Sequence, residues 1–544
     1  MPANTGQSAA DFLRDPTHYP EPTRRVEVVE THCSWVFLAG RRAYKLKKPV
    51  RFEFLDFSTA ALRRAACEEE LRVNRALAPS VYLDVVPLTI EASGEWAIDG
   101  AGAPAEWVVR MRRLPARLSA AAVLRRRQLR PAEAQRVAEL LANFYARRPA
   151  LALTPDEYAR ALERHVRANG EALTAAAQCD AAAARRIQNA QQRFLHVAAD
   201  LIASRVLEGR VVEGHGDLRP EHIYLEDPPV VIDALEFSAE LRQVDVADEL
   251  SFLAMECRRL GDDRLARRVW KRYRQASGDP LPPPLLDFYG CYRAAVRAKV
   301  AVLRQGQQPA GTRGGQADPL PEYVRLAEGY AEGLGPPAAV VVCGLMGSGK
   351  STLADALARA WGAARLSTDR IRRETLGPST APAAYAADRY APAHRERVYD
   401  ALLDRAEEQL RQRITVVLDG TFLARRLRER VRAAATRCGA ACLVVRCQCP
   451  RDVARQRILQ RPAGGDSEAR SDLYDEQVRE FEPPAADEPT LAVDGRQAPA
   501  ALCREVSRAL GTLLFATRRT TPAAQASPAA PLPPAAAPQP PRGD

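Results

Sequence analysis

Short apolar runs with alternating polar positions open the chain, and they predict strands. These runs lie at 26–30, 34–38, 42–47, 81–90 and 107–111. Ser58 precedes a stretch with helical spacing that continues to Ala78, so we expect one helix between the third and fourth of these strands. The pattern therefore predicts a small strand-rich lobe at the start of the chain.

Helical spacing dominates the region after this lobe. Apolar positions recur every three to four residues over 131–207 and again over 245–304, and a turn-rich polar segment at 215–236 separates the two helical regions. A strand lobe with one helix, followed by a helical lobe that a polar loop interrupts, is the layout of protein-kinase-like folds. We therefore expect an α+β kinase-like N-terminal domain.

Strands and helices alternate in the last third of the chain. Apolar runs lie at 338–343, 364–370, 414–419 and 441–447. The first run is β-branched, as a buried parallel strand requires, and Leu353, Ala356 and Leu357 share one face of the helix that follows it. Such alternation predicts an α/β domain with a parallel sheet.

Changes in composition mark the expected domain boundaries. The stretch 305–320 is rich in Gly, Pro and Gln and predicts a linker, and the Pro- and Ala-rich tail cannot bury a core, so we expect it to be disordered. The expected parts are an N-terminal extension at 1–23, a first domain at 24–304, a linker at 305–334, a second domain at 335–516 and a tail at 517–544.

A glycine-rich sequence that fits G-x-x-x-x-G-K-[ST] follows the first strand of the second domain. It consists of Gly344, Leu345, Met346, Gly347, Ser348, Gly349, Lys350 and Ser351, with Thr352 next in the helix. Glycines let the backbone wrap around a phosphate, and the helix N-terminus presents N–H groups to it. In such a loop Lys350 reaches the β- and γ-phosphates and Ser351 holds Mg²⁺, so we predict an ATP site; a chance glycine turn is the alternative.

Charged residues at other strand ends complete the predicted site. Asp419 follows the run 414–418, which holds four apolar residues; this is the Walker B arrangement, and Asp419 is expected to bind the Mg²⁺ shell. Asp369 would lie beside the γ-phosphate and take a proton from an acceptor, or else cap the helix that follows it. Arg457 and Arg461 are candidates for an arginine-bearing lid over the phosphates, with a solvated helix face as the alternative.

The polar segment of the first domain holds a second set of charged residues. Asp217 lies in the sequence H-G-D-L-R-P-E-H, and Asp233 ends a short apolar strand. Phosphoryl transfer needs one carboxylate at the acceptor hydroxyl and another to hold the cation that neutralises the phosphate. The alternative is a tight polar turn before a core strand.

These two motifs resemble the aminoglycoside phosphotransferase family of kinase-like enzymes, over about residues 24–304. The resemblance implies that Asp217 is the catalytic base and Asp233 a Mg²⁺ ligand. His222 stands where most members carry a metal-binding Asn, and an imidazole is a poorer Mg²⁺ ligand than an amide oxygen. A non-catalytic relative of these kinases is therefore an alternative.

Lys45 stands where such enzymes place the lysine of their third strand. The resemblance implies that it contacts the α- and β-phosphates and pairs with a glutamate of the next helix, for which we favour Glu70 over Glu69. A lysine on an edge strand also protects against aggregation, which is the alternative interpretation.

The second domain resembles small P-loop kinases of the zeta-toxin and chloramphenicol-phosphotransferase-like group. The matching pieces are the glycine loop, the S-T-D strand end and the V-L-D-G-T-F sequence. Bacterial proteins that fuse an aminoglycoside-phosphotransferase-like domain to such a kinase resemble this chain from end to end. The resemblance implies ATP and Mg²⁺ as cofactors and a small hydroxylated molecule as the phosphate acceptor.

Charge and cysteine content limit the other function classes. The net charge of +11 favours anions such as nucleotides, but arginines are spread through the helices, so we do not expect a nucleic-acid partner. The 11 cysteines are dispersed and odd in number, which suits reduced thiols in a cytosol. No signal peptide and no apolar run of about 18 residues is visible, so we expect a cytoplasmic protein without a membrane segment.

The sequence thus predicts a two-module, ATP-dependent phosphotransferase that acts on small hydroxylated molecules. One alternative is a P-loop kinase regulated by a catalytically inactive, nucleotide-sensing first domain. Another is a nucleic-acid-associated NTPase. The acceptor and the oligomeric state do not follow from the sequence.

Overall fold

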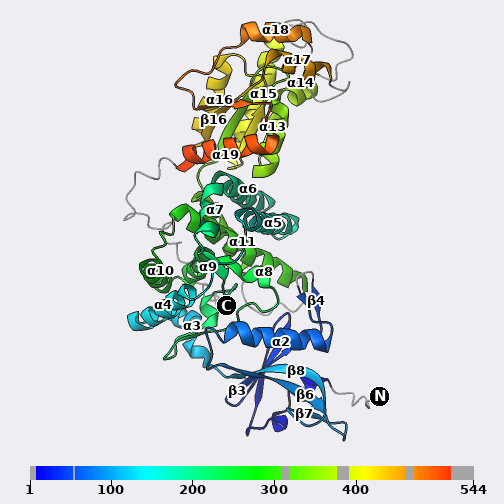
Figure 1. The fold of residues 1–544 in the computed structure, drawn as a ribbon, viewed down its shortest axis with the longest axis vertical. Helices are drawn as coiled ribbons and strands as arrows, with labels where there is room; N and C mark the ends of the chain where they lie inside the picture. The colour runs from blue at the N-terminus through cyan, green and yellow to red at the C-terminus, as the bar shows by residue number, and fades with distance from the viewer. Residues whose placement is uncertain (1–7, 53–54, 308–317, 377–390, 461–470, 516–544) are drawn as a thin grey trace, which may run out of the picture. The chain divides into compact units, whose positions relative to one another are not determined.

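The computed structural model describes residues 8–52, 55–307, 318–376, 391–460 and 471–515. They form two compact units: one holds the described parts of 1–164 and 200–327, and the other those of 165–199 and 328–544 (Figure 1). The predicted tail at 517–544 lies outside the described residues. None of the helices that the structure describes has the length and apolar character needed to cross a membrane.

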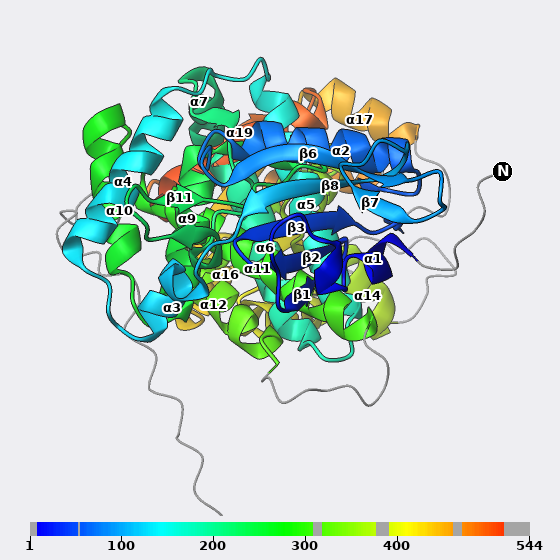
Figure 2. The ribbon, with the colours of Figure 1, turned by 90° about the horizontal axis from the view of Figure 1, so that it is seen from below.

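A six-stranded antiparallel sheet opens the first unit. Its order is β1 (Val26–Glu30), β2 (Ser34–Ala39), β3 (Arg42–Lys47), β8 (Ala103–Arg112), β6 (Tyr82–Ile90) and β7 (Trp96–Ile98). Helix α2 (Ala60–Asn74) packs against β6 and β8 (Figure 2). Its N-cap is Thr59, whose side chain accepts a hydrogen bond from the Leu62 N–H, and not Ser58 as the sequence suggests. The strand-rich lobe with one helix is present as predicted.

Helices follow the strand lobe along the chain. They are α3 (Ala120–Arg125), α4 (Pro131–Ala146), α5 (Pro155–Ala175), α7 (Ala199–Leu207), α8 (Ala239–Arg242), α9 (Val246–Arg259), α10 (Arg264–Ser277), α11 (Pro283–Gln307) and α12 (Leu320–Glu332). Short strands frame the polar segment: β9 (Val211–Glu213) pairs with β12 (Gln243–Asp245), and β10 (Ile223–Tyr224) pairs with β11 (Val230–Val231). The remaining short elements are α1 (Ala9–Phe12), β4 (Arg51–Phe52) and β5 (Leu55–Asp56).

A five-stranded parallel sheet forms the centre of the second unit, as predicted. Its order is β14 (Ala364–Ser367), β15 (Val416–Asp419), β13 (Ala338–Cys343), β16 (Ala441–Gln448) and β17 (Thr490–Asp494). The helices are α6 (Ala181–Val197), α13 (Lys350–Trp361), α14 (Thr368–Leu376), α15 (Pro392–Arg411), α16 (Arg425–Arg437), α17 (Arg451–Leu459), α18 (Ser471–Glu480) and α19 (Pro499–Phe515). Strand β17 is an addition that the apolar pattern does not reveal.

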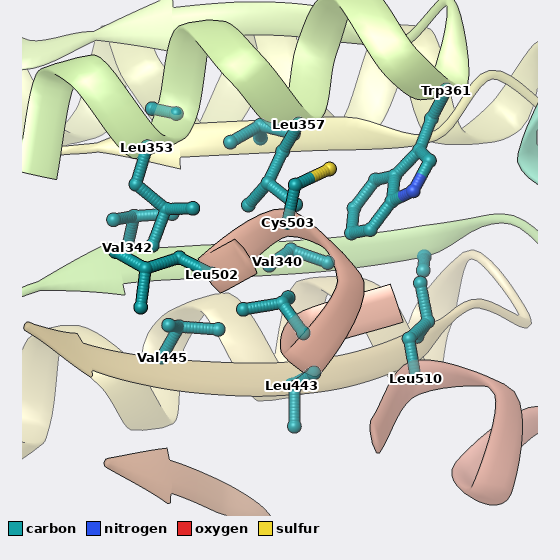
Figure 3. Close-up of a cluster of buried hydrophobic side chains, with 14 of the residues drawn as sticks. Val340, Val342, Leu353, Leu357, Trp361, Leu443, Val445, Leu502, Cys503 and Leu510 are labelled. Atoms are coloured by element: carbon teal, nitrogen blue, oxygen red, sulfur yellow. The ribbon is translucent and has the colours of Figure 1, made fainter. Parts of the chain in front are cut away.

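Both faces of this sheet are covered by apolar side chains. Val340 and Val342 of β13 pack with residues of α13 and α19 (Figure 3). Ala339 and Val341 point to the other face, against α15 and α16. Because successive strand residues alternate between faces, a continuous apolar run is what a strand buried on both sides requires.

Helix α6 belongs to the second unit, although the predicted boundary at 24–304 assigns it to the first domain. Asn189 Nδ2 donates to the carbonyl oxygens of Trp361 (2.9 Å) and Gly362 (3.0 Å), where α13 ends. Its Oδ1 accepts from the Thr415 N–H at 3.1 Å. Arg193 is buried and donates to the Gly335 carbonyl at 2.9 Å, at the entry to β13. The second unit is therefore completed by a helix that comes early in the chain.

Asn189→Ala is expected to lower the free energy of unfolding of the second unit by about 1–3 kcal/mol, because it leaves buried backbone groups without partners. Urea unfolding monitored by Trp361 fluorescence measures the change, since Trp361 is fully buried in this unit. Arg185→Ala, on the exposed side of α6, is the control and should change stability by less than about 0.5 kcal/mol. Equal stabilities of the two variants would contradict the role given to Asn189.

Candidate active sites

The first candidate site is built around Lys45 of strand β3. Its Nζ lies 2.7 Å from Glu70 Oε1 on α2 and 2.8 Å from Asp233 Oδ1. Asp233 is 188 residues away along the chain, so folding brings the predicted lysine, glutamate and aspartate together. Glu69, the other candidate for the partner of Lys45, pairs with Arg72 instead.

Lys47 and Glu236 enlarge this cluster, and neither is a sequence-predicted site residue. Lys47 follows Lys45 by two residues, so both side chains leave the same face of β3. It is buried, with Nζ 2.5 Å from Glu70 Oε2 and in contact with Glu236. Glu70 thus bridges two lysines, and buried charges persist when they are paired in this way. The lysine spacing is visible in the sequence, whereas the distant acid is not.

Asp217 lies in the loop after β9 and is held by Arg219. Arg219 Nε donates to Asp217 Oδ1 at 2.9 Å, and Arg219 Nη2 lies 2.9 Å from Oδ2. Burial would raise the pKa of Asp217, but the charge of Arg219 and its hydrogen bond outweigh burial and hold the pKa at about 2. Asp217 is therefore ionised at neutral pH, and its carboxylate can accept a hydrogen bond from a hydroxyl group.

His222 lies between the two aspartates of this site. Its Nδ1 is 3.7 Å from Asp217 Oδ2, and its Nε2 is 3.6 Å from Asp233 Oδ2. Nδ1 donates to the Asp217 backbone oxygen at 2.9 Å, and Nε2 accepts from Arg219 at 3.0 Å, which fits a neutral ring. Burial and the charge of Arg219 lower the pKa of His222 accordingly. The predicted metal role of His222 does not match this arrangement, because both ring nitrogens are engaged.

Asp233 has an unusual backbone conformation. Its φ is 65°, a left-handed value that few residues other than glycine adopt, and its N–H donates to the Tyr82 hydroxyl at 3.1 Å. Burial opposes ionisation of its carboxyl group, but Lys45 outweighs this and lowers the pKa. Because its pKa is lowered, this carboxylate is ionised at neutral pH. Its side chain is 46% exposed, so it is also open to a cation.

Helix α9 supports the loop that carries Asp217. Glu249 of α9 accepts from the N–H groups of His215 (3.0 Å) and Gly216 (2.5 Å). Asp245 caps α9 by accepting from the Ala247 N–H at 2.8 Å, in line with the structural role that acidic residues have at a helix start.

The second candidate site lies where β13 ends and α13 begins. Gly344 and Gly347 have φ values of 131° and 77°, and a Cβ at either would come within 2.5 Å of a backbone oxygen. Only glycine fits these two positions. Lys350 is the first residue of α13, and its Nζ donates to the Leu345 carbonyl at 2.7 Å, folded back over the loop. Burial lowers its pKa.

Ser351 and Asp419, the two predicted magnesium ligands of this site, lie side by side. Ser351 Oγ donates to Asp419 Oδ1 at 3.3 Å. Arg365 of β14, which was not predicted, lies with Nη2 2.6 Å from Asp419 Oδ2 and with Nη1 2.7 Å from Asp355 Oδ1. In a chain this rich in arginine, no local signal singles out Arg365.

Asp369 lies in the first turn of α14, directly after β14. Its Oδ1 is 2.7 Å from Arg372 Nη1. Ser367 of β14 pairs with Asp419 of the parallel strand β15, so Asp369 and Asp419 lie at the same edge of the sheet. At this position Asp369 could act on an acceptor hydroxyl beside the γ-phosphate, or it could serve only at the start of α14. The catalytic role of Asp369 stays a prediction.

Two helices cover the phosphate loop. Arg457 of α17 donates from Nη1 to the Gly495 carbonyl at 2.9 Å and lies near Gly349, so it faces the loop rather than solvent. Arg461 lies outside the described residues. Gln477 of α18, which was not predicted, accepts from the Met346 N–H through Oε1 at 3.1 Å.

Oxygen donors at the second site fit Mg²⁺. The Ser351 hydroxyl and the Asp419 carboxylate are ligands of the type that Mg²⁺ prefers, and Ser348 Oγ is buried with no hydrogen-bond partner among the described residues. Within the described ranges, no group of three or more His, Cys, Asp or Glu side chains is arranged to hold a metal ion. Most ligands of a bound Mg²⁺ would therefore come from nucleotide phosphates and water.

Comparison with solved structures finds kinases at low similarity. A gluconokinase from Sinorhizobium meliloti is 26% identical and covers 34% of this chain and 98% of its own, with a TM-score of 0.25. A choline/ethanolamine kinase family protein from Mesorhizobium loti is 13% identical and covers 60% of this chain and 92% of its own, with a TM-score of 0.35.

Sequence comparison gives a firmer result. A family model described as an AAA domain matches residues 340–484, which include the whole phosphate loop, so the second unit contains a P-loop domain. Uncharacterized proteins of Mycobacterium tuberculosis and Mycobacterium bovis are each 35% identical over 480 residues, which is 87% of this chain and 92% of theirs. Because that match extends over most of both chains, this chain belongs to the same family as these mycobacterial proteins.

Proposed function

We propose that the protein is a two-module phosphotransferase that uses ATP and Mg²⁺ to phosphorylate hydroxyl groups of small molecules. The observation that carries the proposal is that, in each unit, polar or charged residues that are distant in the sequence come into contact. Lys45 meets Asp233 at 2.8 Å in the first unit, and Ser351, next to Lys350, meets Asp419 at 3.3 Å in the second. A lysine together with a carboxylate that can hold Mg²⁺ is what phosphoryl transfer from ATP requires.

In the second unit, the loop backbone and Lys350 would neutralise the β- and γ-phosphates, while Ser351 and Asp419 would hold Mg²⁺. When bound, Mg²⁺ supplies charge that stabilises the transferring phosphoryl group. Asp419 is now paired with Arg365, so Arg365 would have to share this carboxylate with the ion. Asp369, at the same sheet edge, would orient the acceptor hydroxyl.

In the first unit, Lys45 would contact the nucleotide phosphates and Asp233 would hold Mg²⁺, with Glu70 fixing the lysine. Asp217 would accept a hydrogen bond from the acceptor hydroxyl and orient it. With a pKa of about 2 this carboxylate is a weak base, so orientation is the larger part of its contribution.

A second candidate function for the first unit is nucleotide sensing without transfer. Two observations favour it: Arg219 engages both oxygens of Asp217, and His222 has no nitrogen available for a second metal ion. The Asp217→Asn experiment that follows separates phosphoryl transfer from nucleotide sensing.

Asp217→Asn, made in a Lys350→Ala background that disables the P-loop site, is expected to lower kcat of the first module by about 100-fold or more. ATP consumption over a panel of hydroxylated metabolites provides the readout, and the affinity for ATP should stay within about twofold of the parent, because Asp217 faces the acceptor. Asp156→Asn, an exposed change at the start of α5, is the matched control. ATP binding without any turnover in the Lys350→Ala parent would favour the sensor instead.

A further inference from the structure

A concave surface in the first unit lies apart from the residues of the candidate active sites. It lies between the start of α4 and the first two turns of α10, which run side by side in both views (Figures 1 and 2). The cleft has a volume of about 370 Å³, and Leu129, Pro131 and Ala134 form its apolar part. Its remaining lining consists of Arg130, Arg264, Arg267, Arg268 and Lys271.

Buried carboxylates hold two of these arginines in place. Arg130 lies 2.5 Å from Glu133, and Arg264 lies 2.7 Å from Asp262. The two acid side chains are only 7% and 6% exposed, whereas their arginine partners are 76% and 49% exposed. The carboxylates thus lie beneath the surface and orient guanidinium groups that face outward. Arginines fixed in this way lose less side-chain entropy when they bind an anion.

The other cations leave the cleft with excess positive charge. Arg267 pairs with Asp263 at 2.9 Å, whereas Arg268 and Lys271 form no ion pair with any residue that the structure describes. None of the described lining residues is acidic or aromatic. Arg264, Arg268 and Lys271 recur every three to four residues, so they form a row on one face of α10 that is about 10 Å long. The N-terminal turns of α4 and α10 add partial positive charge at the same place.

We propose that this cleft binds a small molecule that carries several linked phosphate groups. Arginine pairs with phosphate oxygens through two parallel N–H groups, and a row of such side chains matches a chain of phosphates better than it matches a single anion. The volume suits a small ligand. Single-stranded nucleic acid is disfavoured, because its binding surfaces use aromatic side chains for base stacking and this cleft has none among its described lining residues. The site is independent of catalysis at Lys350 or Asp217.

The test uses the full-length Lys45→Met/Lys350→Ala protein, so that neither proposed nucleotide site competes, and inorganic tripolyphosphate as the probe. Calorimetric titration at about 0.05 M salt, where charges are weakly screened, should show binding that Arg268→Glu/Lys271→Glu weakens by about tenfold or more. Arg160→Glu/Arg185→Glu makes the same change in net charge at two exposed helix positions outside the cleft and should change affinity by less than about twofold. If the glutamate variant unfolds, Arg268→Gln/Lys271→Gln replaces it.

ATP without Mg²⁺ is titrated in parallel, and whichever of ATP and tripolyphosphate binds more tightly identifies the source of the linked phosphates. Loss of ATP binding and of tripolyphosphate binding in the cleft variant supports the site. Absence of tripolyphosphate binding, or equal weakening by the cleft and control variants, would overturn the proposal. A single-stranded RNA that binds through Arg268 and Lys271 while tripolyphosphate does not would also overturn it and would identify a nucleic-acid surface.

Discussion

Lys350→Ala is expected to lower ATP-dependent phosphoryl transfer by the second unit by about 100-fold or more, because it removes the side-chain cation that stabilises charge on the transferred phosphate. Lys350 begins α13, and its Nζ already lies over the loop, 2.7 Å from the Leu345 carbonyl. The measurement is kcat/KM for ATP with an acceptor found in the metabolite panel, in an Asp217→Asn background that silences the first unit.

Arg359→Ala is the matched control, since Arg359 lies on the same helix with an exposed side chain. It should leave kcat/KM within about twofold, because a surface cation so far along α13 adds little to the site. If both variants keep full activity, the second unit does not transfer phosphate through its glycine loop.

Arg205→Met is expected to lower the free energy of unfolding of the first unit by about 3–5 kcal/mol, because it leaves two buried carboxylates without their partner. Arg205 is 2% exposed and lies 2.8 Å from Asp245 and 2.6 Å from Asp279. Asp245 caps α9, the helix that supports the Asp217 loop, so the change should also reduce transfer by the first module. Urea unfolding gives the stability.

Arg164→Met removes an exposed ion pair with Glu240 and serves as the control; its effect should stay below about 1 kcal/mol. The pH dependence gives a second readout. Burial would raise the pKa of Asp279, but Arg205 outweighs burial and lowers this pKa below its value in the unfolded chain. The Asp279 carboxylate therefore stabilises the fold at pH values above the unfolded pKa, and this stabilisation is lost as the pH falls through the folded pKa. The loss should be smaller in the variant. Equal stability of Arg205→Met and the wild type would contradict the account.

Local patterns were sufficient for features that depend on neighbouring residues. The glycine loop, the parallel sheet and the position of Asp419 at a strand end all follow from short stretches, because backbone geometry and alternation are local properties. The pairing of Lys45 with Glu70 is an expectation of the family resemblance rather than of a local pattern, and the structure places the two side chains 2.7 Å apart.

Long-range partners could not be predicted in this way. Glu236 meets Lys47, and Gln477 meets Met346, across more than a hundred residues. The amphipathic pattern of α6 indicates that one side of the helix is buried, but it does not indicate which unit the helix packs against. The motif position and the imidazole chemistry of His222 are visible in the sequence, whereas its contact with Arg219 is visible only in the folded loop.

The most direct test of two separate nucleotide sites is the number of molecules of a non-hydrolysable ATP analogue that one protein chain binds with Mg²⁺. Calorimetry in the Arg268→Glu/Lys271→Glu background excludes the cleft on α4 and α10. The account predicts two sites per chain, of which Lys350→Ala removes one and Lys45→Met the other. A single site, or two sites that are both lost in Lys350→Ala, would contradict it.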